Sequence, residues 1–218
     1  ASEEMLAFPD DFSAAIRRLT EEKPEEGPPE AKDLLDLMIV GELTGYSSDV
    51  EGTLIDSAFR GISKLVSVSL PNITEIGTYA FNGCTGLSEV DMPALRRAPA
   101  YAFQNCTSLQ RLVLPALRAM GPYTCDNCTN LEYVDLGTAN SLYPNSFRNC
   151  TGLKTLILRN TDGCKSDVAQ QAFLNSGISE GTGYIYVPAS VMEYYLTQTT
   201  WADFASQYRA IEDYPEIC

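Results

Sequence analysis

The chain has 218 residues, with seven cysteines and no histidine, and its 29 acidic against 15 basic side chains give a formal net charge of -14. That charge opposes binding to nucleic acid and to anionic membranes, because like charges repel each other. Without histidine, Ser/His and Cys/His catalytic pairs are excluded, and no apolar run is long enough to span a membrane. The length suits one elongated domain with covered ends.

Residues 1–51 are predicted to form an N-terminal helical cap and an acidic, proline-rich segment. Asp10 precedes apolar residues spaced as on one face of a helix over residues 10–19, and residues 31–39 are a second helical candidate. The composition between them is typical of a mobile connection. Its acidic residues are Glu21, Glu22, Glu25, Glu26 and Glu30. The sequence begins ASEEM, which suits an N terminus trimmed after export.

Residues 52–183 repeat with a period of 22 residues, and leucine and cysteine carry the period. The leucines are Leu65, Leu87, Leu109, Leu131 and Leu153, and the cysteines are Cys84, Cys106, Cys128 and Cys150. A constant period in the range of about 20–29 residues is typical of leucine-rich solenoids, in which one structural unit is copied and stacked.

Each copy opens with a short segment that alternates between apolar and polar residues. In the first copy Leu65, Val68 and Leu70 are the apolar members, and residues two apart point to the same face of an extended strand. A proline follows this segment in three copies and is expected to end the strand, because it lacks an amide donor. Successive copies should therefore pair their strands into a parallel sheet.

The second half of each copy carries an aromatic residue and, three positions later, the repeating cysteine. Buried free cysteine behaves as a small hydrophobic residue, so we predict a structural ladder of thiols at Cys84, Cys106, Cys128 and Cys150. Cys125 takes the aromatic position of its copy, so the CxxC spacing of Cys125 and Cys128 is interpreted as core packing. A metal or redox site is the less favoured alternative, since no second cysteine pair or histidine accompanies it. Cys164 and Cys218 lie outside the ladder and are expected to be reduced.

The copies resemble the BspA-type leucine-rich repeats of bacterial surface proteins, in units such as LPNITEIGTYAFNGCTGL and MPALRRAPAYAFQNCTSL. The resemblance covers about residues 52–212 and implies an exported or surface protein of a host-associated bacterium with a binding or adhesive role. Some relatives bind extracellular-matrix or host proteins, so a host matrix protein is one candidate partner. The predicted fold class is an α/β repeat, a right-handed leucine-rich-repeat solenoid with short parallel strands and helical terminal caps.

Residues 184–218 are predicted to form a C-terminal strand and a helical cap. Residues 184–187 alternate like a last strand, and Ser190 is expected to cap a helix that runs through Leu196. Residues 201–211 could form another helix, whose aromatic face, including Trp201, would cover the last coil.

The outward positions of the strands provide the candidate partner-binding residues. These are Glu89, Asp91, Arg111, Tyr133 and Asp135, which would form a concave patch for a protein or peptide. Tyr and Arg are enriched in protein interfaces, whereas an ordinary solvated sheet face is the alternative interpretation.

The predicted function is a noncatalytic, cell-surface, adhesin-like module without cofactor, metal or nucleic-acid partner. A structural spacer of a larger surface array is one alternative. A glycan-binding or glycan-active protein is the other, less favoured because the carboxylates Asp91 and Asp135 lie two copies apart with nothing that sets a cleft around them. The predicted location is extracellular or on the bacterial cell surface.

Overall fold

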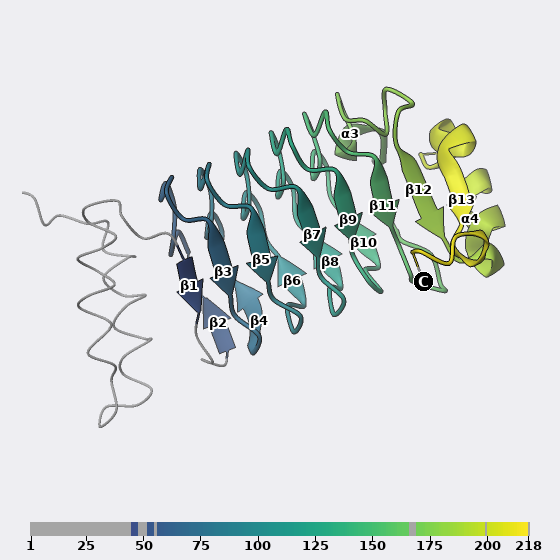
Figure 1. The fold of residues 1–218 in the computed structure, drawn as a ribbon. Helices are drawn as coiled ribbons and strands as arrows, with labels where there is room; N and C mark the ends of the chain where they lie inside the picture. The colour runs from purple at the N-terminus through teal and green to yellow at the C-terminus, as the bar shows by residue number, and fades with distance from the viewer. Residues whose placement is uncertain (1–44, 48–51, 55, 166–168, 199, 218) are drawn as a thin grey trace, which may run out of the picture.

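The structure is a computed structural model that describes residues 45–47, 52–54, 56–165, 169–198 and 200–217. The helices predicted over residues 10–19 and 31–39, the acidic segment between them and Cys218 lie outside the described residues. The described chain forms a row of coils stacked in sequence order, which is the predicted leucine-rich-repeat solenoid (Figure 1).

One side of the solenoid is a row of parallel strands, whose solvent side we call the strand face. The strands are β1 (Gly45–Ser47), β3 (Ser67–Ser69), β5 (Glu89–Asp91), β7 (Arg111–Val113), β9 (Tyr133–Asp135), β11 (Thr155–Ile157), β12 (Tyr184–Val187) and β13 (Tyr208–Ala210). Hydrogen bonds join them in the orders β1-β3-β5 and β7-β9-β11-β12-β13. Ser67 of β3 lies opposite Glu89 of β5, one period later, so equivalent positions of successive copies stack in columns. The predicted strands are confirmed.

A second row of short parallel strands, which the sequence analysis did not predict, lies behind the first (Figure 1). It consists of β2 (Gly52–Leu54), β4 (Ile73–Ile76), β6 (Arg97–Ala98), β8 (Ala119–Met120) and β10 (Ser141–Leu142). These strands pair in the spatial order β10-β8-β6-β4-β2. Strands of two residues contain no readable alternation, so the hydrophobic pattern does not reveal them.

The core consists of columns of apolar side chains, one from each copy. The repeating leucines, from Leu65 to Leu153, are fully buried. The rings of Phe81 and Phe103 stack with their centroids 5.4 Å apart and their planes 5° apart. Cys125 is fully buried at the aromatic position of the third copy, as predicted. One coil could not bury this surface, but stacked coils share it.

Each copy turns through a residue with positive φ immediately before its ladder cysteine. The residues are Gly83 (φ 75), Asn105 (φ 62), Asn127 (φ 62) and Asn149 (φ 58). Asparagine enters this left-handed region more readily than most residues, because its short polar side chain can bond to the local backbone. Asparagine therefore takes the turn position that glycine holds in the first copy.

The four ladder cysteines are free, buried thiols. Each Sγ donates to a backbone carbonyl oxygen of the preceding copy: Cys84 to Phe59 at 2.9 Å, Cys106 to Phe81 at 3.2 Å, Cys128 to Phe103 at 3.0 Å and Cys150 to Cys125 at 3.0 Å. Burial raises the pKa of Cys84 to about 12 and raises the pKa of Cys106 and of Cys150 well above the usual range. These three thiols therefore stay protonated at neutral pH, and all four side chains fill the core.

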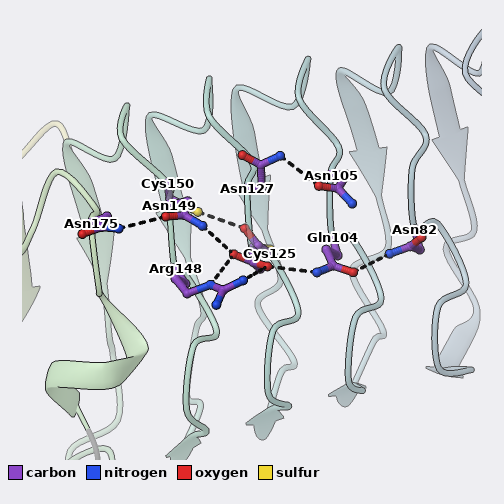
Figure 2. Close-up of polar contacts among 10 residues, drawn as sticks. Asn82, Gln104, Asn105, Cys125, Asn127, Arg148, Asn149, Cys150 and Asn175 are labelled. Atoms are coloured by element: carbon purple, nitrogen blue, oxygen red, sulfur yellow. Dashed lines mark hydrogen bonds and ion pairs between the residues drawn. The ribbon is translucent and has the colours of Figure 1, made fainter.

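A buried carboxylate between Cys125 and Cys128 anchors a polar network along the turn edge (Figure 2). Asp126 is only 2% exposed and accepts hydrogen bonds from Nε and Nη2 of Arg148, both at 2.9 Å, and from Nε2 of Gln104 at 2.9 Å. The hydrogen bonds that Arg148 donates to Asp126 raise the pKa of Arg148. Gln104 in turn accepts from Asn82 at 2.8 Å. The network satisfies the buried charge, so its role is structural.

The C-terminal end differs from the prediction after β12. Its helical elements are α3 (Ala169–Ala172), η2 (Ala189–Val191), α4 (Met192–Thr197), η3 (Ala202–Gln207) and η4 (Ile211–Asp213). A single helix over residues 201–211 is wrong, because β13 occupies part of that stretch and pairs with β12. Ser190 lies inside η2 and does not cap α4. Trp201, 1% exposed, packs against Tyr195 with ring centroids 5.2 Å apart, and these rings belong to the main core, as predicted.

Candidate partner-binding face

Four of the five predicted partner-binding residues are accessible on neighbouring strands of the strand face. Glu89, Asp91 and Arg111 are exposed, and Tyr133 is half-buried. Ser69 donates a hydrogen bond to Asp91 at 2.8 Å, which fixes that carboxylate without neutralising it. Successive strands of a sheet lie about 4.8 Å apart, so β5, β7 and β9 place these groups within reach of one ligand.

Asp135 does not belong to this exposed set, because it is only 7% exposed. Its Oδ2 accepts from Nη2 of Arg159 at 2.8 Å, and its Oδ1 accepts from the backbone N–H of Gly137 at 2.9 Å. The same Nη2 of Arg159 donates to the carbonyl oxygen of Ile217 at 2.6 Å. The prediction of an exposed Asp135 is wrong, since Arg159 and the C-terminal segment are held against it.

The C-terminal segment covers part of the strand face. Ile211 and Ile217 pack with Ile157 of β11 and Tyr186 of β12 in a small apolar cluster, separate from the main core. The ring of Tyr214 meets the edge of Tyr186 with centroids 5.1 Å apart. In Figure 1 the yellow chain after β13 returns to the lower ends of β12 and β11. The same cluster reaches β9, where Tyr133 packs against it, whereas Glu89 and Asp91 of β5 and Arg111 of β7 stay exposed.

Two arginines of the strand face lie over tyrosine rings. Cζ of Arg111 lies 3.8 Å from the ring centroid of Tyr133, and Cζ of Arg209 lies 4.2 Å from that of Tyr184. A guanidinium over an aromatic face is attracted by the ring quadrupole, which orders both side chains. The sequence analysis missed the second pair, because Arg209 was assigned to a helix rather than to β13, next to β12.

The two carboxylates that the sequence analysis considered as an acid–base pair lie in different surroundings. Asp91 and Asp135, the carboxylates considered for acid–base chemistry on a glycoside, belong to β5 and β9, with β7 between them in the row (Figure 1). Asp135 is buried and forms an ion pair with Arg159, so the two carboxylates do not face a common space. Arginine and tyrosine are enriched in protein interfaces, whereas aspartate and glutamate are depleted there.

The burial of Asp135 predicts that its substitution changes stability rather than binding. Asp135→Ala should lower the free energy of unfolding by about 3 kcal/mol, because the partly buried Arg159 loses its counter-ion. Asp91→Ala removes an exposed carboxylate and should change stability by no more than about 0.5 kcal/mol. Urea unfolding of both variants measures the difference, and equal stability of the two would contradict the structural role of Asp135.

A family profile described as "BspA type Leucine rich repeat region" matches six copies over residues 52–179. No functionally curated protein matches the chain. Within the described residues, no helix is both long and apolar enough to cross a bilayer.

Among solved structures, the T. pallidum leucine-rich repeat protein TpLRR is 28% identical, with a TM-score of 0.51 over 53% of this chain and 59% of that chain. The pneumococcal vaccine antigen PcpA is 21% identical, with a TM-score of 0.56 over 78% of this chain and 40% of that chain. The chain thus spans less than two thirds of either structure, and the similarity to PcpA extends to the fold alone.

Proposed function

Because the chain belongs to the BspA-type leucine-rich repeat family, whose members are typically bacterial surface proteins, we propose that it is a noncatalytic surface module that binds a protein or peptide. Leucine-rich-repeat domains typically mediate protein interactions and are generally not enzymes. The contact surface in this proposal consists of Glu89, Asp91, Arg111 and Tyr133, on β5, β7 and β9.

The stacking of Arg111 on Tyr133 is the observation that carries the proposal. With 3.8 Å between guanidinium carbon and ring centroid, the pair presents an ordered, amphipathic surface in the uncovered part of the strand face. Binding to a side chain that is already ordered loses less conformational entropy than binding to a mobile one. Arginine and tyrosine are also among the residues that contribute most to interface energies.

The charge of the surface indicates the kind of partner. Glu89 and Asp91 are exposed carboxylates on a chain of net charge -14, so a basic segment of the partner would be attracted to them. Arg111 retains N–H donors for a carboxylate or carbonyl group of the partner. A host extracellular-matrix protein is the class of partner that we propose, with the module outside the cell or on its surface.

The experiment is capture of host matrix and serum proteins on the full chain, repeated with variants. Arg111→Ala/Tyr133→Ala should reduce capture of the partner by at least about ten-fold, since interface arginines and tyrosines often contribute 2 kcal/mol or more. The matched control is Arg60→Ala/Tyr79→Ala, which removes the same pair of residue types from the turn edge, where Cζ of Arg60 lies 5.0 Å from the ring of Tyr79. Equal capture by both double variants, at unchanged folding, would place the contact elsewhere.

A further inference from the structure

The second row of strands carries a cluster of exposed cations that the proposed contact surface does not use. We call Arg96, Arg97, Arg118 and Lys165 the basic column; all of them are exposed. Arg118 stands one copy after Arg96 and donates its backbone N–H to the carbonyl oxygen of Arg96 at 2.9 Å. Lys165 shares the register of Arg97, and the uncharged Ala119 and Ser141 lie between them.

Most other described cations have a partner within the protein. Arg148, Lys154 and Arg159 form ion pairs with Asp126, Glu132 and Asp135, and Arg60, Arg111 and Arg209 lie over tyrosine rings. Within the described part of the chain, no ion pair or ring contact engages the basic column. Even Glu75, which stands opposite Arg97 in the sheet, forms no ion pair with it. Neighbouring like charges on adjacent coils repel each other unless an anion lies between them.

We propose that the basic column binds a sulfated polysaccharide, a thin polyanion that can follow the column from coil to coil. Three of its four members are arginines, whose planar guanidinium groups match oxyanions with two parallel hydrogen bonds. Arg96 and Arg118 lie on adjacent coils, about 4.8 Å apart, with Arg97 beside Arg96 and Lys165 two coils beyond Arg118, so successive anionic groups of one chain can meet several of these cations. This site lies on a different row of strands from the proposed protein contact surface and does not depend on it.

The surroundings of the basic column disfavour other polyanions. A membrane or a nucleic-acid duplex is wide, so the remaining surface of this protein, whose net charge is -14, would repel it. A thin polysaccharide that lies within one Debye length of the basic column, about 8 Å, is attracted mainly by the column itself. The neighbours in the sheet, Ala119 and Ser141, offer neither an aromatic ring for stacking a base nor an apolar anchor for a peptide. β6 and β8 are paired on both sides, so they have no free edge for an added peptide strand.

The experiment uses a fluorescent heparin decasaccharide and the full chain, with binding measured by anisotropy from about 50 to 150 mM salt. Arg96→Gln/Arg97→Gln/Arg118→Gln should weaken binding by about ten-fold or more and make its salt dependence shallower, because fewer counter-ions are released. The matched control is Arg60→Gln/Lys64→Gln/Lys154→Gln, which removes the same charge from exposed positions outside both proposed surfaces and should weaken binding by less than about two-fold. Unchanged thermal unfolding of both variants establishes that folding is intact.

Four outcomes would overturn the inference. An equal loss in both triple variants would mean that net charge, rather than the column, governs binding. If a fully desulfated oligosaccharide of the same length bound as tightly as the heparin decasaccharide, sulfate groups would not be what the column recognises. If a glutamate decapeptide competed as effectively as unlabelled heparin decasaccharide, the column would be a site for acidic peptides. If inorganic sulfate did so, the column would be a site for simple anions.

Discussion

Above about pH 9 the free energy of unfolding should fall steeply, because buried thiols stay protonated in the folded chain and ionise in the unfolded one. Burial raises the pKa of Cys84 and of Cys164 to about 12. Burial also raises the pKa of Cys106, Cys125 and Cys150 well above the usual range. An unfolded thiol has a pKa of about 8.5, so from there upward the unfolded chain binds fewer protons than the folded one, and its free energy falls relative to that of the folded chain.

The size of this effect follows from the number of thiols. Each thiol with a raised pKa lowers the free energy of unfolding by about 1.4 kcal/mol per pH unit, over the pH range between its pKa in the unfolded chain and its pKa in the folded chain. Because a domain is stable by only about 5–15 kcal/mol, the five thiols together should unfold the solenoid within about one to two pH units above pH 9. Below about pH 8 the thiols should contribute no pH dependence, since they are protonated in both states.

Urea unfolding followed by circular dichroism, at a series of pH values from about 7 to 10.5, measures the slope. Cys164→Ala is the control, because it removes one titrating thiol from outside the ladder and should make the slope shallower by about 1.4 kcal/mol per pH unit. At about pH 8 the six described cysteines, all buried, should also react slowly with a thiol reagent in the native protein and quickly once it is unfolded. Stability that stays constant up to about pH 10.5 would contradict the buried, protonated ladder.

The repeated parts of the molecule could be predicted from the sequence because each structural position occurs several times. Leu65, Val68 and Leu70 alone are compatible with a strand or a short buried helix, but the same pattern one period later favours the strand. Cys128 seen alone beside Cys125 suggests a metal or redox site. Its recurrence at Cys84, Cys106 and Cys150, together with the phenylalanines at the position of Cys125, identifies both thiols as core residues.

The features that were missed occur once or depend on contacts distant in the sequence. The burial of Asp135 depends on Arg159, which forms an ion pair with it, and on Ile217, whose carbonyl oxygen binds the same guanidinium. No period links these residues, so their contact is not visible in the repeat. The spacing of the aromatic residues in 201–211 is typical of a helix. In the structure β13 instead pairs with β12, so the backbone hydrogen-bonding groups of β12 are not left as an open sheet edge.

Gly137→Ala should destabilise the protein by about 3 kcal/mol or more, through a backbone clash. Gly137 stands where three other copies have Pro71, Pro93 or Pro115, and its φ is 52. A Cβ atom at this position would lie 2.1 Å from the carbonyl oxygen of Pro115 and 2.6 Å from its carbonyl carbon. Both atoms are backbone of the preceding coil, so relief requires the two coils to move apart rather than a side chain to rotate.

Gly61→Ala is the matched control, because it introduces the same methyl group at a positive φ without the clash. Gly61 has φ 77, and a Cβ atom there would meet nothing within 4 Å. Gly61→Ala should therefore lower the free energy of unfolding by about 1 kcal/mol, the cost of holding alanine in the left-handed backbone conformation. Urea unfolding of both variants separates the two contributions. If Gly137→Ala lowered the free energy of unfolding no more than Gly61→Ala, the close backbone contact between Gly137 and Pro115 would be contradicted, because that contact is what distinguishes the two sites.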